Sequence, residues 1–95
     1  MIVNRLTYTV KLGRMQELLD FVNADRKKHG YNYRIYQSNI GTFDQAAFEL
    51  EFEDLAAFDK FWSEWIALPE TAAFMEKFNE MTLPGGTNEI WNLIE

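Results

Sequence analysis

Hydrophobic and polar residues alternate along residues 2–12, IVNRLTYTVKL. Ile2 and Leu6 fall on one face of an extended chain, whereas Arg5 falls on the other. Because successive side chains of a β-strand point to opposite faces, this alternation predicts a first strand. Gly13 is expected to end it.

From Arg14 to His29 the spacing of the apolar residues changes to that of a helix. The apolar residues of this segment recur every three or four positions and so share one side: Met15, Leu18, Leu19 and Val22. Gly30 stands where a C-terminal cap is expected, because glycine adopts the left-handed conformation at little cost. The pattern predicts a first helix of about four turns.

Two further alternating stretches, residues 31–40 and the FELEF segment at 48–52, are separated by the turn sequence GTFD and predict a β-hairpin. Directly opposed residues on one face of a hairpin with a four-residue loop are Arg34 with Glu51, and Tyr36 with Glu49. In this register Glu51 lies opposite a cationic residue, whereas Glu49 does not.

A second helix is predicted to begin after Asp54, because an aspartate before a helical pattern caps the free backbone N–H groups. Its apolar residues form a wide stripe: Leu55, Phe58, Phe61, Trp62, Trp65 and Ile66. Pro69 interrupts this helix, and residues 70–81 are expected to continue as a separate helical segment. The sequence LPGG at residues 83–86 then breaks the chain before a last strand, Glu89–Ile94.

The predicted order β-α-β-β-α-β is that of a ferredoxin-like α+β fold, with residues 1–95 forming one domain. Right-handed crossovers place the third strand between the first and second strands, and the fourth strand beside the first. The expected result is a four-stranded antiparallel sheet with both helices, the second interrupted near Pro69, on one face. The other face of the sheet is left bare.

The chain resembles the dimeric α/β-barrel superfamily, and within it small proteins of the NIPSNAP and antibiotic-biosynthesis-monooxygenase types. The resemblance runs through RLTYTVKLGRMQELLDF, YRIYQSNIGTFDQAAFELEFEDLAAFDKFW and EIWNLIE. It implies a homodimer in which two sheets pack bare face to bare face and close a barrel. Some members of the superfamily degrade haem with an Asn, a Trp and a His on the second helix. The second helical region here has no His, which argues against haem.

On the bare face, Glu49 and Glu51 are expected to point toward the barrel interior, beside Arg5 and Arg34. We interpret Arg5, Arg34 and Glu51 as a structural ion-pair group, because an adjacent guanidinium makes the burial of a carboxylate tolerable. Glu49, with no cation opposite it, is the candidate catalytic base. If the charges instead lie at a solvent-exposed rim, their pairing contributes little to stability. The sequence leaves both alternatives open.

Six residues are candidates for ligand binding, because they combine polar or acidic groups with aromatic surface: Asn4, Tyr8, Tyr36, Glu51, Trp62 and Trp65. The leading hypothesis is the binding of a small hydrophobic or aromatic ligand, and it leaves open whether the protein also acts on that ligand as a cofactor-independent monooxygenase or isomerase. The alternative is a non-enzymatic dimeric module that serves interaction or regulation. The sequence does not decide whether the protein is an enzyme.

The amino-acid composition limits the kinds of partner that the protein can bind. Of the 95 residues, 47% are hydrophobic and 16% aromatic, which is more bulky apolar surface than a small core hides, so part of it is expected to meet a partner. The net charge of −6 argues against nucleic acid. No apolar run reaches the roughly 18 residues of a membrane span.

The remaining expectations concern location and metals. The chain has no Cys and its start has no export signal, so we expect a cytoplasmic protein that does not enter the membrane. His29, the only histidine, is expected to cap the C-terminal end of the first helix. No metal site is predicted and no cofactor is expected, because no residue spacing fits a ligand set.

Overall fold

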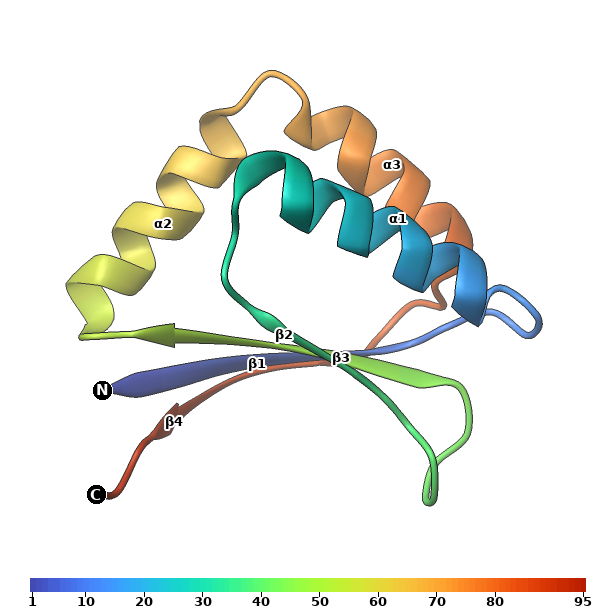
Figure 1. Ribbon diagram of the computed structural model, residues 1–95, viewed down its shortest axis with the longest axis horizontal. Coiled ribbons are helices and arrows are strands. Elements are labelled where there is room, and N and C mark those ends of the chain that lie inside the picture. The colour runs from blue at the N-terminus through green and yellow to red at the C-terminus, as the bar shows by residue number, and fades with distance from the viewer.

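The computed structural model describes all 95 residues and contains four strands and three helices in the order β-α-β-β-α-α-β (Figure 1). The elements are β1 Ile2–Thr9, α1 Met15–His29, β2 Arg34–Gln37, β3 Gln45–Phe52, α2 Leu55–Ala67, α3 Thr71–Met81 and β4 Thr87–Asn92. The strands form one antiparallel sheet in the order β2-β3-β1-β4. The predicted ferredoxin-like α+β fold and its strand order are confirmed.

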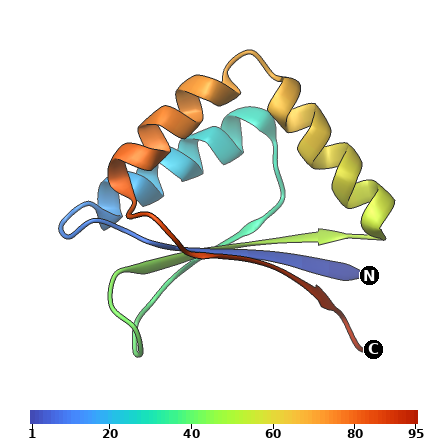
Figure 2. The same cartoon turned by 180° about the vertical axis from the view of Figure 1, so that it is seen from behind.

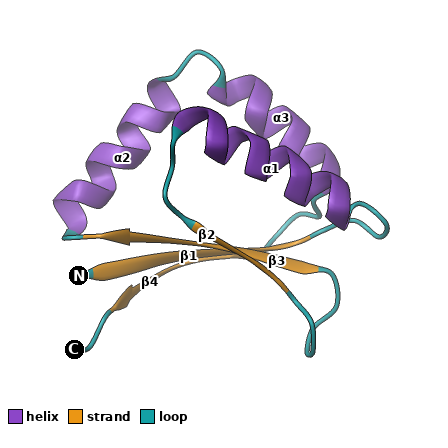
Figure 3. Ribbon diagram, viewed as in Figure 1, coloured by secondary structure: helices purple, strands orange, loops and turns teal.

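The molecule has two layers, and all three helices lie on the same face of the sheet (Figure 3). Seen from either side, α2 and α3 lean together like the two slopes of a roof, with α1 alongside α3 (Figures 1 and 2). No helix covers the opposite face of the sheet. The chain therefore has one face packed against helices and one bare sheet face.

Local sequence sets the ends of the helices. Gly30 ends α1 in the left-handed conformation, with φ at 68°. The Asp54 side chain caps α2, because its Oδ1 accepts a hydrogen bond of 2.9 Å from the backbone N–H of Ala57. Pro69 lies in the turn between α2 and α3, where the chain changes direction between the two helices. These three predicted boundaries are confirmed.

The core lies between the sheet and the helices. Eight buried residues form it, seven from α1, β3 and α3 and one, Val10, directly after β1: Val10, Leu18, Val22, Ala46, Phe48, Leu50, Phe78 and Met81. None of these residues comes from α2, which has no buried residue. The helix rests on the core through side chains that stay partly exposed, among them Phe61 and Trp62.

The predicted register of the β2–β3 hairpin is wrong by two residues. Arg34 lies opposite Glu49 rather than Glu51, and Tyr36 lies opposite Ala47 rather than Glu49. The hairpin loop is longer than four residues, because the backbone N–H of Ser38 bonds to the Gln45 carbonyl at 2.9 Å. A shift of two residues keeps every side chain on its predicted face, so the alternation alone could not reveal it.

The link between α3 and β4 contains two glycines that differ in their surroundings. Gly85 and Gly86 both have positive φ values, of 99° and 102°. A Cβ atom at Gly86 would collide with the backbone carbonyl oxygen of Thr7 on β1, whereas a Cβ at Gly85 would meet open space. The close approach of two backbones therefore requires glycine at position 86 specifically.

This difference gives a matched pair of substitutions. Gly85→Ala is expected to lower the free energy of unfolding by about 1–3 kcal/mol, the usual cost of a side chain in this backbone conformation. Gly86→Ala carries the same cost and must also push β4 away from β1, so its loss should be clearly larger. Urea denaturation followed by circular dichroism measures both. Equal losses would mean that the Gly86 backbone does not need to approach β1.

Candidate functional site

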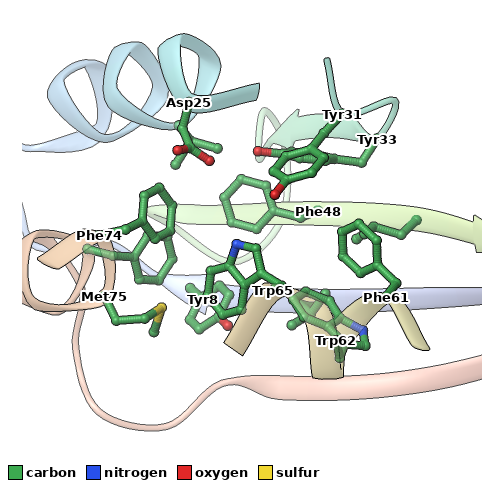
Figure 4. A pocket seen from close by; sticks show the side chains of 14 residues that line it. Tyr8, Asp25, Tyr31, Tyr33, Phe48, Phe61, Trp62, Trp65, Phe74 and Met75 are labelled. Atoms are coloured by element: carbon green, nitrogen blue, oxygen red, sulfur yellow. The ribbon is translucent and has the colours of Figure 1, made fainter. Parts of the chain in front are cut away.

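A pocket lies between the helices and the covered face of the sheet (Figure 4). Its volume is about 180 Å³, and of its fourteen lining residues only Asp25 is charged. Nine of the lining residues are aromatic: Tyr8, Tyr31, Tyr33, Phe48, Phe61, Trp62, Trp65, Phe74 and Phe78. Much of the aromatic surplus in the composition is therefore gathered around one cavity.

Strand alternation and helical spacing together bring these residues to the pocket. Alternation along β1 and β3 sends Leu6 and Phe48 to the face that the helices cover. Trp65 of α2 packs against Phe74 of α3 across the bend at Pro69, because the two helices slope toward each other (Figure 1). A single straight helix in place of α2 and α3 could not present two walls to the same cavity.

The aromatic walls are built from rings packed edge to face. The Trp62 and Trp65 rings are 5.4 Å apart at 89°, and Trp65 meets Phe74 at 6.0 Å and 85°. Such pairs contribute about 0.5–1.5 kcal/mol beyond the burial of their surface. These contacts fix the side chains, so the pocket belongs to the folded structure and does not depend on a ligand to form it.

Asp25 brings the only carboxylate to the pocket. It lies near the C-terminal end of α1, and its side chain points toward the aromatic rings (Figure 4). Burial raises the pKa of Asp25 above its usual range, while His29 and Lys28 act in the opposite direction. The nearest basic side chain is His29, whose Nε2 lies 3.5 Å from Oδ1. The carboxylate therefore has little to compensate for its burial.

His29 ends α1, as predicted, and joins two acidic side chains. Its Nε2 lies 3.5 Å from Asp25 and 3.6 Å from Glu70, which precedes α3. Its ring stacks on Tyr31, with the centroids 5.0 Å apart and the planes at 16°. His29 thus links α1 to the start of α3 beside the pocket, which is more than the capping role expected from the sequence.

Three tyrosines supply hydroxyl groups to the pocket. Burial raises the pKa of Tyr33 to about 12, and it raises the pKa values of Tyr8 and Tyr31 as well. All three phenols are therefore protonated near neutral pH and can donate a hydrogen bond. No side-chain polar atom is buried without a hydrogen-bond partner, so a hydroxyl that has no partner within the chain reaches the pocket or solvent.

Asn4, predicted as a ligand-binding residue, lies behind the pocket wall. It is fully buried, and its Oδ1 accepts a hydrogen bond of 3.1 Å from the indole N–H of Trp62. Its Nδ2 donates to Asn88 Oδ1 at 2.7 Å and to the Glu89 carbonyl at 3.0 Å. Because these bonds use the amide of Asn4, the residue positions Trp62 and is not placed to contact a ligand.

The other predicted site residues lie on the bare sheet face. Glu49 is 3.4 Å from Arg5 on one side and 3.4 Å from Arg34 on the other, and Arg34 also binds Glu51 at 2.8 Å. The Tyr36 hydroxyl donates to Glu49 at 3.4 Å. The expectation that Glu49 has no cationic partner is wrong, because the true hairpin register puts Arg34 directly opposite it.

The sheet therefore divides the predicted site residues into two groups. Tyr8, Trp62 and Trp65 line the pocket. Tyr36, Arg5, Arg34 and Glu49 lie on the other side of the sheet and line neither cavity, whereas Glu51 lines a second cavity that shares four residues with the pocket. Sequence reasoning missed Asp25, although it shares the apolar side of α1 with Leu18 and Val22, and an acid on an apolar helix face was the available signal.

The structure contains neither a metal-binding cluster of side chains nor a membrane-spanning helix. The structure contains no cluster of three or more His, Cys, Asp or Glu side chains arranged to hold a metal ion. None of its helices combines the length and the hydrophobicity that crossing a bilayer requires.

Known structures share this fold at low sequence identity. An uncharacterised NIPSNAP domain protein from Burkholderia xenovorans is similar with a TM-score of 0.86 and 18% identity, over 99% of this chain and 95% of that chain. A NIPSNAP family protein from Agrobacterium tumefaciens strain C58 gives a TM-score of 0.85 and 19% identity, over 99% of this chain and 93% of that chain.

An antibiotic biosynthesis monooxygenase is also similar, with a TM-score of 0.72 and 15% identity over 100% of both chains. No protein-family model and no curated protein matches the sequence. The predicted resemblance to NIPSNAP-type and antibiotic-biosynthesis-monooxygenase-type proteins is confirmed for the fold.

The role of Asn4 can be tested by removing its amide. Asn4→Ala should lower the free energy of unfolding by at least about 2 kcal/mol, because buried groups left without a partner cost about 1–3 kcal/mol each. Asn92→Ala is the control, since Asn92 is an exposed β4 residue and its loss should change stability by less than about 0.5 kcal/mol. Chemical denaturation measures both variants. A change as small as that of the control would remove the positioning role.

Proposed function

We propose that this protein is a homodimer whose subunits each bind a small hydrophobic or aromatic molecule in the pocket between helices and sheet. The observation that carries the proposal is the pocket itself, which is lined by nine aromatic residues and one carboxylate. Ligand sites are usually concave and apolar, with a few polar groups that fix orientation. An acid and tyrosine hydroxyls within an aromatic cavity match that description.

The size of the pocket limits the ligand. Its volume of about 180 Å³ is slightly larger than an engineered protein cavity of about 150 Å³ that binds benzene. The pocket therefore suits one aromatic ring with a short substituent. A second cavity of about 360 Å³ shares Tyr31, Tyr33, Leu50 and Phe61 with the first, and it gives room for a ligand to extend toward solvent.

The proposal has a second part, which is that the protein also catalyses a reaction of the bound molecule. The fold is shared with an antibiotic biosynthesis monooxygenase, which is the reason to consider oxidation or isomerisation of the bound molecule. A base in such a reaction must lie within hydrogen-bond reach of the ligand. Asp25 satisfies this condition for the pocket, whereas Glu49 faces the other side of the sheet and is paired with two arginines.

The charge pattern of the bare sheet face supports the homodimer. A row of directly opposed residues, Arg34, Glu49, Arg5 and Glu89, crosses all four strands with alternating charge. Trp91 on β4 belongs to the same face and is 57% exposed. A row of alternating charge can pair with a copy of itself turned by a twofold axis, which is the symmetry of most homodimers.

Binding of neutral one-ring molecules tests the pocket. Indole and phenol are expected to bind the protein and to raise its thermal unfolding midpoint, because a ligand that binds only the folded state stabilises it. Val22→Phe should weaken this binding by about tenfold or more, since the larger side chain occupies pocket volume. Isothermal titration calorimetry measures the affinities.

Leu19→Phe is the matched control, because Leu19 is on the same helix and does not line the pocket. This variant should bind both probes like the parent protein. If Val22→Phe also bound them like the parent, or if neither probe bound the parent, the pocket would not be a binding site. The non-enzymatic interaction module would then be the better description of the protein.

The dimer is tested by reversing one charge. The parent protein is expected to have twice the chain mass of 11.2 kDa in light scattering at micromolar concentration. Glu49→Lys would place a third cation between Arg5 and Arg34 and remove the carboxylate that both contact. Burying this excess of positive charge at an interface is unfavourable, so the dimer should dissociate. Glu76→Lys makes the same charge change on the exposed surface of α3 and should leave the dimer intact. A dimeric Glu49→Lys variant would exclude this face as the interface.

A further inference from the structure

The position of Asp25 restricts what the pocket can bind. Only 18% of its side chain is exposed, and no hydrogen bond to the carboxylate is formed within the chain. Its single close polar neighbour is His29, at 3.5 Å, and His29 is shared with Glu70. Burying a carboxylate is costly unless the charge is paired or hydrogen-bonded. Burial raises the pKa of Asp25, and His29 and Lys28 offset this effect only in part.

The walls around Asp25 are suited to a positive charge. Aromatic ring faces carry negative electrostatic potential and attract ammonium and guanidinium groups. The chain already uses one of these rings in this way, because the Arg26 guanidinium lies 5.8 Å from the centroid of the Tyr33 ring. Arg26 is held away from Asp25 by its bonds to the Tyr33 carbonyl and to Asn23. Arg26 therefore does not supply the counter-charge that Asp25 lacks.

The surroundings of the pocket are acidic as well. The second cavity, which shares four residues with the first, has Glu51 and Glu53 in its wall and no Lys, Arg or His, although Met1, which carries the α-amino group, also lines it. Arg34 partly compensates Glu51, and Lys28 lies close enough to Asp25 to lower its pKa. The chain as a whole carries a charge of −6. This distribution attracts cations toward the pocket and repels anions.

We propose that the pocket takes a hydrophobic cation: an aromatic ring that carries a short ammonium-bearing arm, with the ammonium group on Asp25 and the ring among the pocket aromatics. This inference rests on the proposed binding function and names its ligand class. A neutral ring would fill the cavity and leave the carboxylate unpaired. An aromatic molecule with a negative charge would be repelled by the Asp25 carboxylate. A cationic one both pairs its charge with Asp25 and buries its ring in the pocket.

Three probes that share a phenyl ring and differ in charge test this assignment. They are 2-phenylethylammonium, the neutral 2-phenylethanol and the anionic 3-phenylpropionate. Titration calorimetry with the full chain at neutral pH is expected to show the ammonium probe binding about tenfold or more tightly than the alcohol, because a charge-assisted bond is stronger than a neutral one. The carboxylate probe should bind most weakly.

The substitution Asp25→Asn tests whether the Asp25 carboxylate is the group that binds the ammonium probe. The variant should bind the ammonium probe about tenfold or more weakly than the parent, while its affinity for the alcohol stays within about twofold. Its fold should persist, with a thermal midpoint close to that of the parent, because the substitution keeps the shape of the side chain and removes a carboxylate whose burial is only partly compensated. Asp59→Asn is the matched control, since it removes one negative charge from the exposed surface of α2 and should keep the preference for the ammonium probe.

Two results would overturn the inference in distinguishable ways. If the alcohol or the carboxylate bound the parent as tightly as the ammonium probe, or if Asp25→Asn kept the ammonium preference, the ligand would not be a cation. The aromatic pocket would then still stand as a binding site. If no probe bound at millimolar concentration, and indole and phenol also failed to bind, the proposed binding function itself would fall.

Discussion

The strict alternation of side chains across the sheet is the constraint on which the rest of this structure depends. Along β3, Phe48 and Leu50 turn toward the helices, while Glu49 and Glu51 turn away. One strand therefore supplies the floor of an aromatic pocket and the centre of a charged surface at the same time. Neither side can be altered by a slip of one residue without placing acids in the core and phenyl rings in the charged row.

The features that could be predicted from the sequence are those set by interactions between residues close together in the chain. Periodicity, glycine caps, Asp54 and Pro69 act within a few residues, so the elements and their order could be predicted. Strand order followed from general rules on crossovers. The hairpin register could not be predicted, because it depends on the length of a loop and both candidate registers, two residues apart, keep the same faces.

The candidate site was predicted only in part, for a similar reason. Trp62 and Trp65 were visible as an excess of apolar surface on one helix, and they do line the pocket. Asp25 became a candidate only through rings that come from five other parts of the chain, which no local pattern connects. Asn4 looked like a ligand-binding amide because its partners, Asn88 and Glu89, are more than eighty residues away.

The lack of any buried residue in α2 has a consequence for motion. The cap at Asp54, ring contacts and the Asn4–Trp62 bond hold this helix in place, whereas α1 and α3 are anchored by residues such as Leu18 and Phe78 in the core. Segments with few buried contacts open locally at a lower free energy than the whole domain, and their amides exchange with deuterium earlier. The wall of the pocket that carries both pocket tryptophans is thus expected to open at a lower free energy than α1 and α3, so a ligand can enter by local opening of α2 while the other two helices remain folded.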